Sequence, residues 1–365
     1  MKMEKRYYGD LLVLHPYGRI DTLNAEEFQN DLMEATGEDN TLTIDLIDVE
    51  YISSSGLRAF INTAKKYPDK SFSMINVNEE VMDIFEMTGF TDIFQIEPYQ
   101  SNTDDIRVIF FDIDGTLLSQ KTKKVPRSTI ESIRKLQEKG IRCVVATGRD
   151  IHEMKNNLPL DDIHFDGFLT LNGNICLDKN EKMFAGNEID PRDVEVLVSI
   201  FDAGRIPFMF IEEDTRYINF VDDTVLETQK KTNVTIPEVG EYKGNKVYQC
   251  ISFVDSEIRE KLENLLDHCK ITSWNETGID IISKDGGKAA GIQKFLDKEG
   301  FSRYQAMAFG DGENDMTMLK YVGTGVAMGN AVENLKKEAD YVTTDIDDDG
   351  IRNALIHFGL LGEDE

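Results

Sequence analysis

The sequence contains three short, wholly apolar runs, and a polar loop directly follows each of them. This feature restricts the possible folds of the chain more than any other. The runs VIFF (108–111), CVVA (143–146) and AMAF (306–309) lead into DIDGT, TGR and GDGEND. A run without a polar position is typical of a parallel strand that is buried on both faces. Doubly wound sheets of such strands bind ligands just beyond the carboxyl ends of the strands. We therefore expect an α/β fold with a site at these loops.

The pattern also divides the chain of 365 residues into domains. The polar segment EPYQSNTDD separates a first α/β-patterned region from a larger one. Within the larger region, RIPFMFIEEDTRYINFV and YQCISFV read as antiparallel strands of an inserted subdomain, which we interpret as a lid. We predict a first domain at 1–98, a linker at 99–105, a core at 106–182 and 275–365, and a cap at 183–274.

The segment RSTIESIRKLQEKG predicts a helix of the core. Ser128 and Glu131 have the spacing of a capping box, and Gly140 is placed to end the helix.

Composition excludes several classes of function. The net charge of −28 argues against a nucleic-acid footprint and against an anionic membrane surface. No apolar run approaches the ~18 residues of a membrane span, and the first residues lack the apolar length of a signal peptide. The four cysteines form no CxxC pair, so we expect free thiols in a reducing compartment. The expected location is the cytoplasm.

The loop after the first apolar run carries two carboxylates, Asp112 and Asp114. Carboxylates two residues apart can supply a nucleophile or metal ligand and a neighbouring acid. The loop that begins at Asp311 supplies further hard oxygen ligands of the kind that magnesium prefers. Taken singly, either loop is equally a surface turn of an acidic protein.

Two further segments suit an anion. Thr147 and Gly148 end another strand, where a hydroxyl and backbone N–H groups can bind phosphate. Lys288 follows two glycines at the start of a helix and can neutralise negative charge. The alternatives are an ordinary strand-to-helix turn and a solvated lysine. Because the strand ends of one sheet meet at one edge, we expect these loops to converge.

In this order, the segments DIDGTLL, ATGR, LNGNI, GGKAAG, GDGENDMTML, GVAMGNA and ADYVT resemble the haloacid dehalogenase superfamily of phosphohydrolases, and most closely its Cof-type, subclass IIB branch. The resemblance covers roughly residues 106–359. It implies a Rossmann-like core with an α/β cap inserted after LNGNI.

The resemblance also implies roles for single residues. Asp112 would attack phosphorus to form an aspartyl phosphate, and Asp114 would act as the acid and then the base. Mg²⁺ would be held by Asp112, Asp114 through its backbone carbonyl, and Asp311. Asp315 would be a further ligand or would act on the ion without contacting it. The phosphoryl oxygens would be bound by Ile113, Thr147, Gly148, Lys288 and Asn314.

The first region resembles a STAS domain, the module of sulfate transporters and anti-sigma-factor antagonists. The resemblance is carried by GRIDTLNAEEF, TIDLIDVEYISSSGLRAF and VNEEVMDIFEMTGF. It implies a protein partner and phosphorylation at Ser54, although Ser53 stands where the family usually has aspartate. In the alternative interpretation, Ser54 or Ser55 is merely the N-cap of the helix.

Two functions follow from these patterns. The first is a magnesium-dependent phosphatase of a small phosphorylated metabolite, a sugar phosphate or a phosphorylated cofactor, with a regulatory STAS domain. The second is a signalling protein whose hydrolase domain acts on a phosphoprotein. A closing cap favours the first, since a phosphoprotein loop needs an open approach. The charged loop formed by Glu212, Glu213, Asp214 and Arg216 either lines the site or is a solvated hairpin turn.

Overall fold

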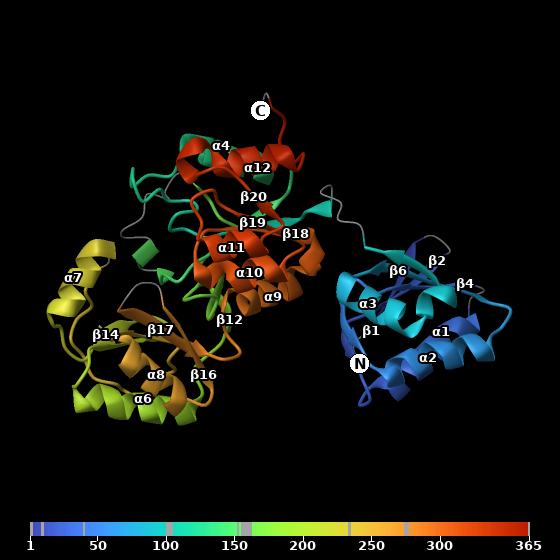
Figure 1. Ribbon diagram of the computed structural model, residues 1–365, viewed down its shortest axis with the longest axis horizontal. Coiled ribbons are helices and arrows are strands. Elements are labelled where there is room, and N and C mark those ends of the chain that lie inside the picture. Colours follow the sequence, from blue (N-terminus) through green and yellow to red (C-terminus); the bar gives the residue numbers. More distant parts are fainter. Residues whose placement is uncertain are drawn as a thin grey trace. The chain divides into compact units, whose positions relative to one another are not determined.

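The structure is a computed structural model that describes residues 3–8, 11–38, 41–99, 105–151, 153–154, 163–232, 235–273 and 277–363. The chain divides into two compact units, Met1–Asn102 and Thr103–Glu365 (Figure 1). Residues 100–104 of the expected linker and Trp274 at the expected end of the cap lie outside the described residues.

The first unit is built on a five-stranded sheet of order β1-β2-β4-β6-β7. Its strands are β1 (Met3–Tyr8), β2 (Leu11–Pro16), β4 (Thr41–Asp45), β6 (Ser71–Val77) and β7 (Gln95–Pro98), and a small parallel pair is formed by β3 (Gly18–Ile20) and β5 (Val49–Ile52). The helices are α1 (Ala25–Glu38), α2 (Ser54–Lys66) and α3 (Glu79–Thr88). Phe28, Phe60 and Phe85, one from each helix, share a buried core with the strands. The predicted α/β character of this region is confirmed.

The core of the second unit is an eight-stranded sheet of order β12-β11-β10-β9-β8-β18-β19-β20. Six neighbouring strands, from β10 to β20 in that order, are parallel, and β11 and β12 are antiparallel. The strands are β8 (Val108–Phe111), β9 (Arg142–Ala146), β10 (Gly167–Thr170), β11 (Ile175–Asp178), β12 (Met183–Gly186), β18 (Ala306–Gly310), β19 (Thr324–Ala327) and β20 (Tyr341–Val342). The three apolar runs are therefore the adjacent strands β9, β8 and β18, as expected for a doubly wound sheet.

Helices cover both faces of this sheet. They are α4 (Arg127–Glu138), α9 (Lys288–Glu299), α10 (Met316–Tyr321), α11 (Glu333–Glu338) and α12 (Gly350–His357). Helix α4 packs with α12 and α9 packs with α10, on opposite sides of the strands (Figure 1). Helix α4 lacks the predicted capping box, because Pro126 is its N-cap and no side chain caps it.

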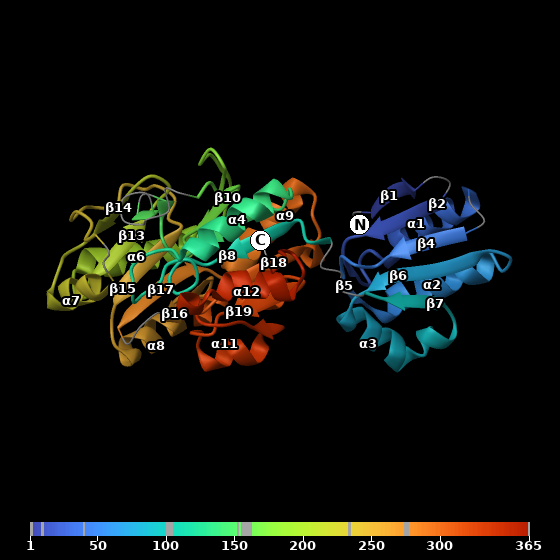
Figure 2. The same ribbon diagram turned by 90° about the horizontal axis from the view of Figure 1, so that it is seen from above.

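The cap is an antiparallel sheet of order β14-β13-β15-β17-β16 with three helices, gathered at one end of the second unit (Figure 2). Its elements are α6 (Pro191–Ala203), β13 (Phe208–Ile211), β14 (Arg216–Ile218), α7 (Asp223–Thr232), β15 (Gln249–Phe253), α8 (Ser256–Leu265), β16 (Cys269–Ser273) and β17 (Gly278–Ser283). Residues 284–287 connect β17 directly to α9 of the core.

The chain passes between the core sheet and the cap sheet at positions that differ from the expected cap boundaries, 183 and 274. Strand β12 begins at Met183 but pairs with β11 in the core sheet, and β17 lies beyond 274 but pairs with β15 and β16 in the cap. The change in sequence pattern indicates that a subdomain is inserted, but it does not show to which sheet β12 and β17 belong. A short strand has the same sequence pattern in either sheet.

Two expectations from composition can be compared with the structure. All four cysteines are buried and free, as predicted. In the part of the chain that the structure describes, no helix has the length and apolarity needed to span a membrane.

Candidate active site

The loop after β8 places Asp112 at the carboxyl end of the core sheet. Strands β8 and β18 pair in parallel with Phe111 opposite Phe309, and the backbone N–H of Asp112 donates to the Phe309 carbonyl at 3.0 Å. Gly115 has a φ of 95°, and a Cβ on it would overlap Oδ2 of Asp311. Only glycine therefore lets the two acidic loops approach each other this closely.

Lys288 is the cation at the centre of these loops. It begins α9, and its Nζ donates to Oδ1 of Asp112 at 2.6 Å and to Oδ1 of Asp315 at 2.5 Å. Burial alone would lower the pKa of this lysine, but the two carboxylates raise its pKa above the usual value. Lys288 is therefore a buried, permanently charged partner for Asp112.

Three carboxylates gather around this lysine. Asp112, Asp311 and Asp315 each offer an oxygen, and the three oxygens lie within 4.8 Å of one another. Burial, reinforced by repulsion between the carboxylates, raises the pKa of Asp112 to about 7 and that of Asp311 to about 8. One lysine leaves this cluster with excess negative charge. A divalent cation that prefers oxygen would balance it, so the donor set fits Mg²⁺.

Asp315 also organises the loop after β18. Its Oδ2 accepts the backbone N–H groups of Asp311 and Gly312, each at 2.9 Å, while Oδ1 binds Lys288. Both oxygens are thus engaged, and the carboxylate ties the loop to the lysine.

Asp114 lies in a different environment from Asp112. Its side chain is 40% exposed, and Nε and Nη2 of Arg149 donate to its two oxygens at 2.7 and 2.8 Å. This fork-to-fork pair fixes the orientation of the carboxylate. The sequence interpretation names Arg149 only as part of the TGR loop and gives it no role.

The residues expected to bind phosphate come from the neighbouring strand ends. The pairing of Phe111 with Val145 puts Thr147 and Gly148 at the same edge as Asp112. Thr147 and Ile113 are buried. Nδ2 of Asn314 donates to Oδ1 of Asn172 at 3.3 Å, and a Cβ on Gly148 would lie 3.3 Å from that oxygen. Asn172 belongs to the LNGNI segment, where the sequence pattern gives it no separate role, and its φ of 55° fits its place in a tight turn.

The predicted catalytic, phosphate-binding and metal-binding residues therefore all belong to loops at one edge of the core sheet. Direct contacts join Asp112, Lys288, Asp311 and Asp315, while Asp114 is held by Arg149. Ser54 is part of the first unit and is considered below.

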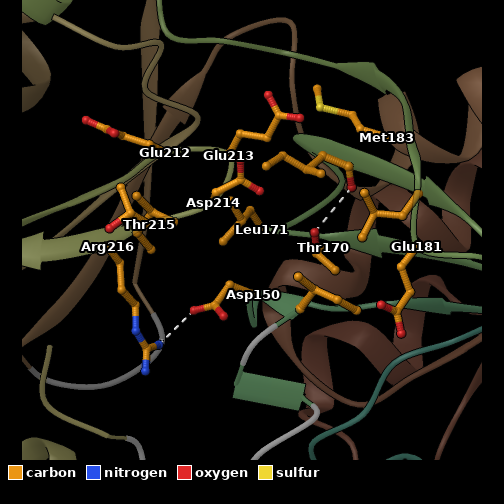
Figure 3. Close-up of a pocket in the computed structure, with 14 residues that line it drawn as sticks. Asp150, Thr170, Leu171, Glu181, Met183, Glu212, Glu213, Asp214, Thr215 and Arg216 are labelled. Carbon is orange, nitrogen blue, oxygen red and sulfur yellow. Dashed lines mark hydrogen bonds and ion pairs between the residues drawn. The ribbon is translucent and has the colours of Figure 1, made fainter.

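A cavity of about 430 Å³ lies between the core and the β13–β14 hairpin of the cap (Figure 3). Its charged lining consists of Asp150, Glu181, Glu212, Glu213, Asp214 and Arg216. The predicted charged loop lines this cavity, and Glu213 and Asp214 are exposed at the hairpin turn. That the loop lines the active site stays a prediction. The cavity is separate from the carboxylate cluster, since neither Asp112 nor Lys288 lines it.

Arg216 joins the cap to the core at this cavity. Its Nη1 donates to Oδ2 of Asp150 at 2.7 Å (Figure 3). The same Nη1 donates to Oε2 of Glu153 at 3.4 Å. Oε1 of Glu153 in turn accepts from Nη1 of Arg149 at 3.3 Å. A chain of alternating charges therefore runs from the cap hairpin to Asp114.

In the first unit, Ser53 caps helix α2. Its Oγ accepts the backbone N–H of Gly56 at 3.3 Å, while Ser54 is the first helical residue and is exposed. The interpretation of Ser54 or Ser55 as the N-cap is therefore wrong by one or two positions. Phosphorylation of Ser54 stays a prediction.

Comparison with known families gives two matches. The model of haloacid dehalogenase-like hydrolases matches residues 109–355, well over half of the chain. The model of the STAS domain matches residues 2–106.

Individual proteins are similar over most of the same length. YkrA of Bacillus subtilis (strain 168) is 36% identical over 260 residues, which are 70% of this chain and 99% of YkrA. The 5-amino-6-(5-phospho-D-ribitylamino)uracil phosphatase YcsE of the same organism is 30% identical over 267 residues, 70% of this chain and 97% of YcsE. The solved structure of the subclass IIB sugar phosphatase BT4131 is 32% identical, with a TM-score of 0.65 over 70% of this chain and 100% of that structure.

Proposed function

The chain belongs to the haloacid dehalogenase-like hydrolase family and carries an N-terminal STAS domain, and we propose that it is a magnesium-dependent phosphohydrolase of a small phosphomonoester. The chain is an enzyme of the phosphatase class, as are the members of the family to which it is similar. We propose a sugar phosphate or a phosphorylated cofactor as the substrate. The similarity to a sugar phosphatase and to a ribitylaminouracil phosphatase supports this choice.

In the proposed reaction, a carboxylate oxygen of Asp112 attacks phosphorus while the bond from phosphorus to the leaving oxygen breaks. Once released from Arg149 and protonated, Asp114 gives its proton to that oxygen, and the product leaves as a neutral alcohol. Asp114 then takes a proton from water, whose oxygen attacks phosphorus and breaks the bond to Asp112, so that inorganic phosphate is released. The ion pair with Lys288 supports Asp112 as the nucleophile, because it favours the ionised carboxylate.

We assign the binding of the phosphoryl group to the loops around Asp112 and Lys288. Ile113, Thr147, Gly148 and Asn314 would donate to phosphoryl oxygens, and Lys288 would balance their charge. Such fixed donors and charges are the main requirement of phosphoryl transfer.

The metal is assigned to the carboxylate cluster. Asp112, Asp311 and Asp315 and the backbone carbonyl of Asp114 would hold Mg²⁺, and Asp315 at the same time anchors Lys288. When bound, the ion supplies positive charge that offsets the carboxylates and the phosphoryl oxygens.

Contacts between cap and core favour a small substrate over a phosphoprotein. The cap reaches the core through the ion pair of Arg216 with Asp150 and through the hydrogen bond from Asn172 to Asp280. A cap held at these points restricts the approach of a folded protein to the carboxylate cluster.

We propose that the STAS domain is regulatory and binds a protein partner, with Ser54 as its phosphorylation site. The exposure of Ser54 at the start of α2 supports access for a kinase. A phosphate there would face backbone N–H groups at the positive end of the helix dipole.

The buried contact of Lys288 with Asp112 and Asp315 is the observation that carries the proposed phosphatase mechanism. It is tested by phosphate release from sugar phosphates and phosphorylated cofactors, with Mg²⁺ and after chelation. We expect turnover that requires Mg²⁺ and falls by roughly 10³-fold or more in Asp112→Asn, which keeps the shape but removes the nucleophile. Turnover that survives this substitution would contradict the mechanism, and failure on every small ester would contradict the substrate class.

A further inference from the structure

Two buried polar side chains, Gln249 and Asp280, lie on the face of the cap sheet that is turned toward the core. In the strand pairing, Gln249 is opposite Ile211 and Asp280 is opposite Ile251. Residues directly opposite each other share a face of the sheet. Ile211 lines the cavity between cap and core, and Ile251 packs into the same apolar cluster as Leu171 of the core. Gln249 and Asp280 are only 1% and 8% exposed.

Asn172 of the core connects these two side chains to the phosphate-binding loops. Its Nδ2 donates to Oδ2 of Asp280 at 2.9 Å and to Oε1 of Gln249 at 3.4 Å. Its Oδ1 accepts from Asn314, and its backbone N–H donates to the carbonyl of Thr147 at 2.8 Å. A buried polar chain therefore leads from the proposed phosphate site to the cap wall.

The amide of Gln249 is incompletely paired. Its Nε2 is buried and has no hydrogen-bond partner within the described part of the chain. A buried N–H without an acceptor is costly, so a ligand oxygen at this point would be bound favourably. The carboxylate of Asp280, held by the same Asn172, provides an acceptor in the same place.

We propose that Gln249 and Asp280 form a subsite that recognises a hydroxyl group of the leaving alcohol, which makes the substrate a sugar or polyol phosphate. A hydroxyl can accept from the Gln249 amide and donate to the Asp280 carboxylate, which gives the buried Gln249 donor an acceptor. The subsite rests on the proposed phosphatase function and deepens it.

The charges of the subsite also define what it rejects. A second phosphate or a carboxylate at this point would be repelled by Asp280. A leaving group without hydroxyls offers nothing to either side chain and leaves the Gln249 donor unpaired. Sites built to hydrogen-bond a substrate group discriminate strongly against analogues that lack the group.

The test compares two classes of substrate in two variants of the full chain. Gln249→Met removes the amide at similar volume, and Asp280→Asn keeps the shape but removes the charge. We expect each to lower kcat/KM for sugar and polyol phosphates at least about tenfold. Hydrolysis of p-nitrophenyl phosphate, whose leaving group carries no second hydroxyl, should fall by a much smaller factor, so that the ratio of the two activities changes in both variants.

Ser252→Ala is the matched control. Ser252 lies on the same strand but on the opposite face, where its Oγ donates to the Pro207 carbonyl at 2.7 Å. This variant also loses a buried hydrogen bond and should keep the ratio of the two activities unchanged.

Equal losses on both substrate classes, or no loss in either variant, would overturn the subsite. If Gln249→Met does not fold, Asp280→Asn decides alone. A wild-type protein that hydrolyses p-nitrophenyl phosphate but no hydroxyl-bearing phosphate overturns the subsite and leaves the phosphatase chemistry standing. A wild-type protein that hydrolyses neither in the presence of Mg²⁺ overturns the proposed function and the subsite together.

Discussion

The turns before α9 and α2 follow one local plan, in which a strand leads through a polar turn into a helix, yet they have different outcomes. The turn before α9 delivers Lys288 to Asp112 and Asp315, which belong to other strand ends. In the turn before α2, the Ser53 hydroxyl accepts a hydrogen bond from the backbone N–H of Gly56, three residues further along the chain. The two turns differ because carboxylates from the core sheet lie within reach of Lys288, whereas the Ser53 hydroxyl is bonded within its own turn. Substitutions at Lys288, Gly115, Arg216 and Ser53 test this contrast.

Replacing Lys288 by methionine should break the charged centre. It leaves the buried carboxylates of Asp112 and Asp315 without their cation, which costs about 3–5 kcal/mol of stability. We expect phosphate release to fall by roughly 10³-fold or more, since both a positioned charge and the nucleophile's partner are lost. Lys261→Met, which removes an exposed i,i+4 pair with Glu257, is the control and should cost less than about 1 kcal/mol. A Lys288→Met protein with wild-type turnover would contradict the central role of the cluster.

Gly115→Ala should separate the two acidic loops. The new Cβ overlaps Oδ2 of Asp311, so we expect activity to fall by roughly 10²-fold as the carboxylate is displaced. Gly140→Ala is a matched control, because Gly140 also has a positive φ, 82°, but has open space around its Cβ position. It should cost about 1–2 kcal/mol in thermal unfolding with unchanged kcat. Similar kinetic losses in both variants would show that backbone strain alone matters.

Arg216→Gln should weaken the contact between cap and core without disturbing the carboxylate cluster. The pair with Asp150 is partly buried, so we expect a change of about tenfold in kcat/KM for the best substrate. Arg192→Gln removes an exposed pair with Asp190 on helix α6 and should leave kinetics unchanged. If kcat/KM of Arg216→Gln equals that of the wild type, the ion pair between Arg216 and Asp150 does not contribute to turnover.

Ser53→Ala should have the smallest effect on hydrolysis. Loss of an N-cap costs about 0.5–2 kcal/mol of helix stability, so amide hydrogen exchange in residues 54–66 should become faster. Ser54→Ala should leave this exchange within about twofold of wild type, because Ser54 is not the cap. Phosphate release should be unchanged in both. Faster exchange in Ser54→Ala instead would reverse the assignment of the cap.

The sequence predicts those parts of the core that depend on strand periodicity. Apolar runs buried on both faces identify β8, β9 and β18, and polar residues directly after such strands must meet at one edge. The convergence of Asp112 and Asp311 follows from this geometry. The place of Lys288, which follows strand β17 of the cap sheet, is implied by the family resemblance alone. The α/β character of both units is likewise visible from pattern alone.

Contacts made by long side chains across the fold are not predictable in this way. Arg149 reaches Asp114, and Asn172 reaches Asp280 in another sheet, because tertiary packing sets the direction of each side chain. Ser128 is a similar case, since its hydroxyl donates to Asp349 at 2.5 Å instead of capping α4. Glu131 pairs with Arg127 within the helix. Ser128 and Glu131, the two residues of the predicted capping box, therefore both bind other side chains.

The short connection between β17 and α9 limits how modular this enzyme can be. Residues 284–287 join the strand that holds Asp280 to the helix that begins with Lys288, and Nζ of Lys270 donates to the Gly286 carbonyl at 2.6 Å within this connection. A chimaera that imports a foreign cap must therefore retain β17 and its support by Lys270, or it will shift the lysine along with the cap. Asp280 of the proposed subsite and Lys288 of the carboxylate cluster therefore lie on one segment of nine residues, 280–288.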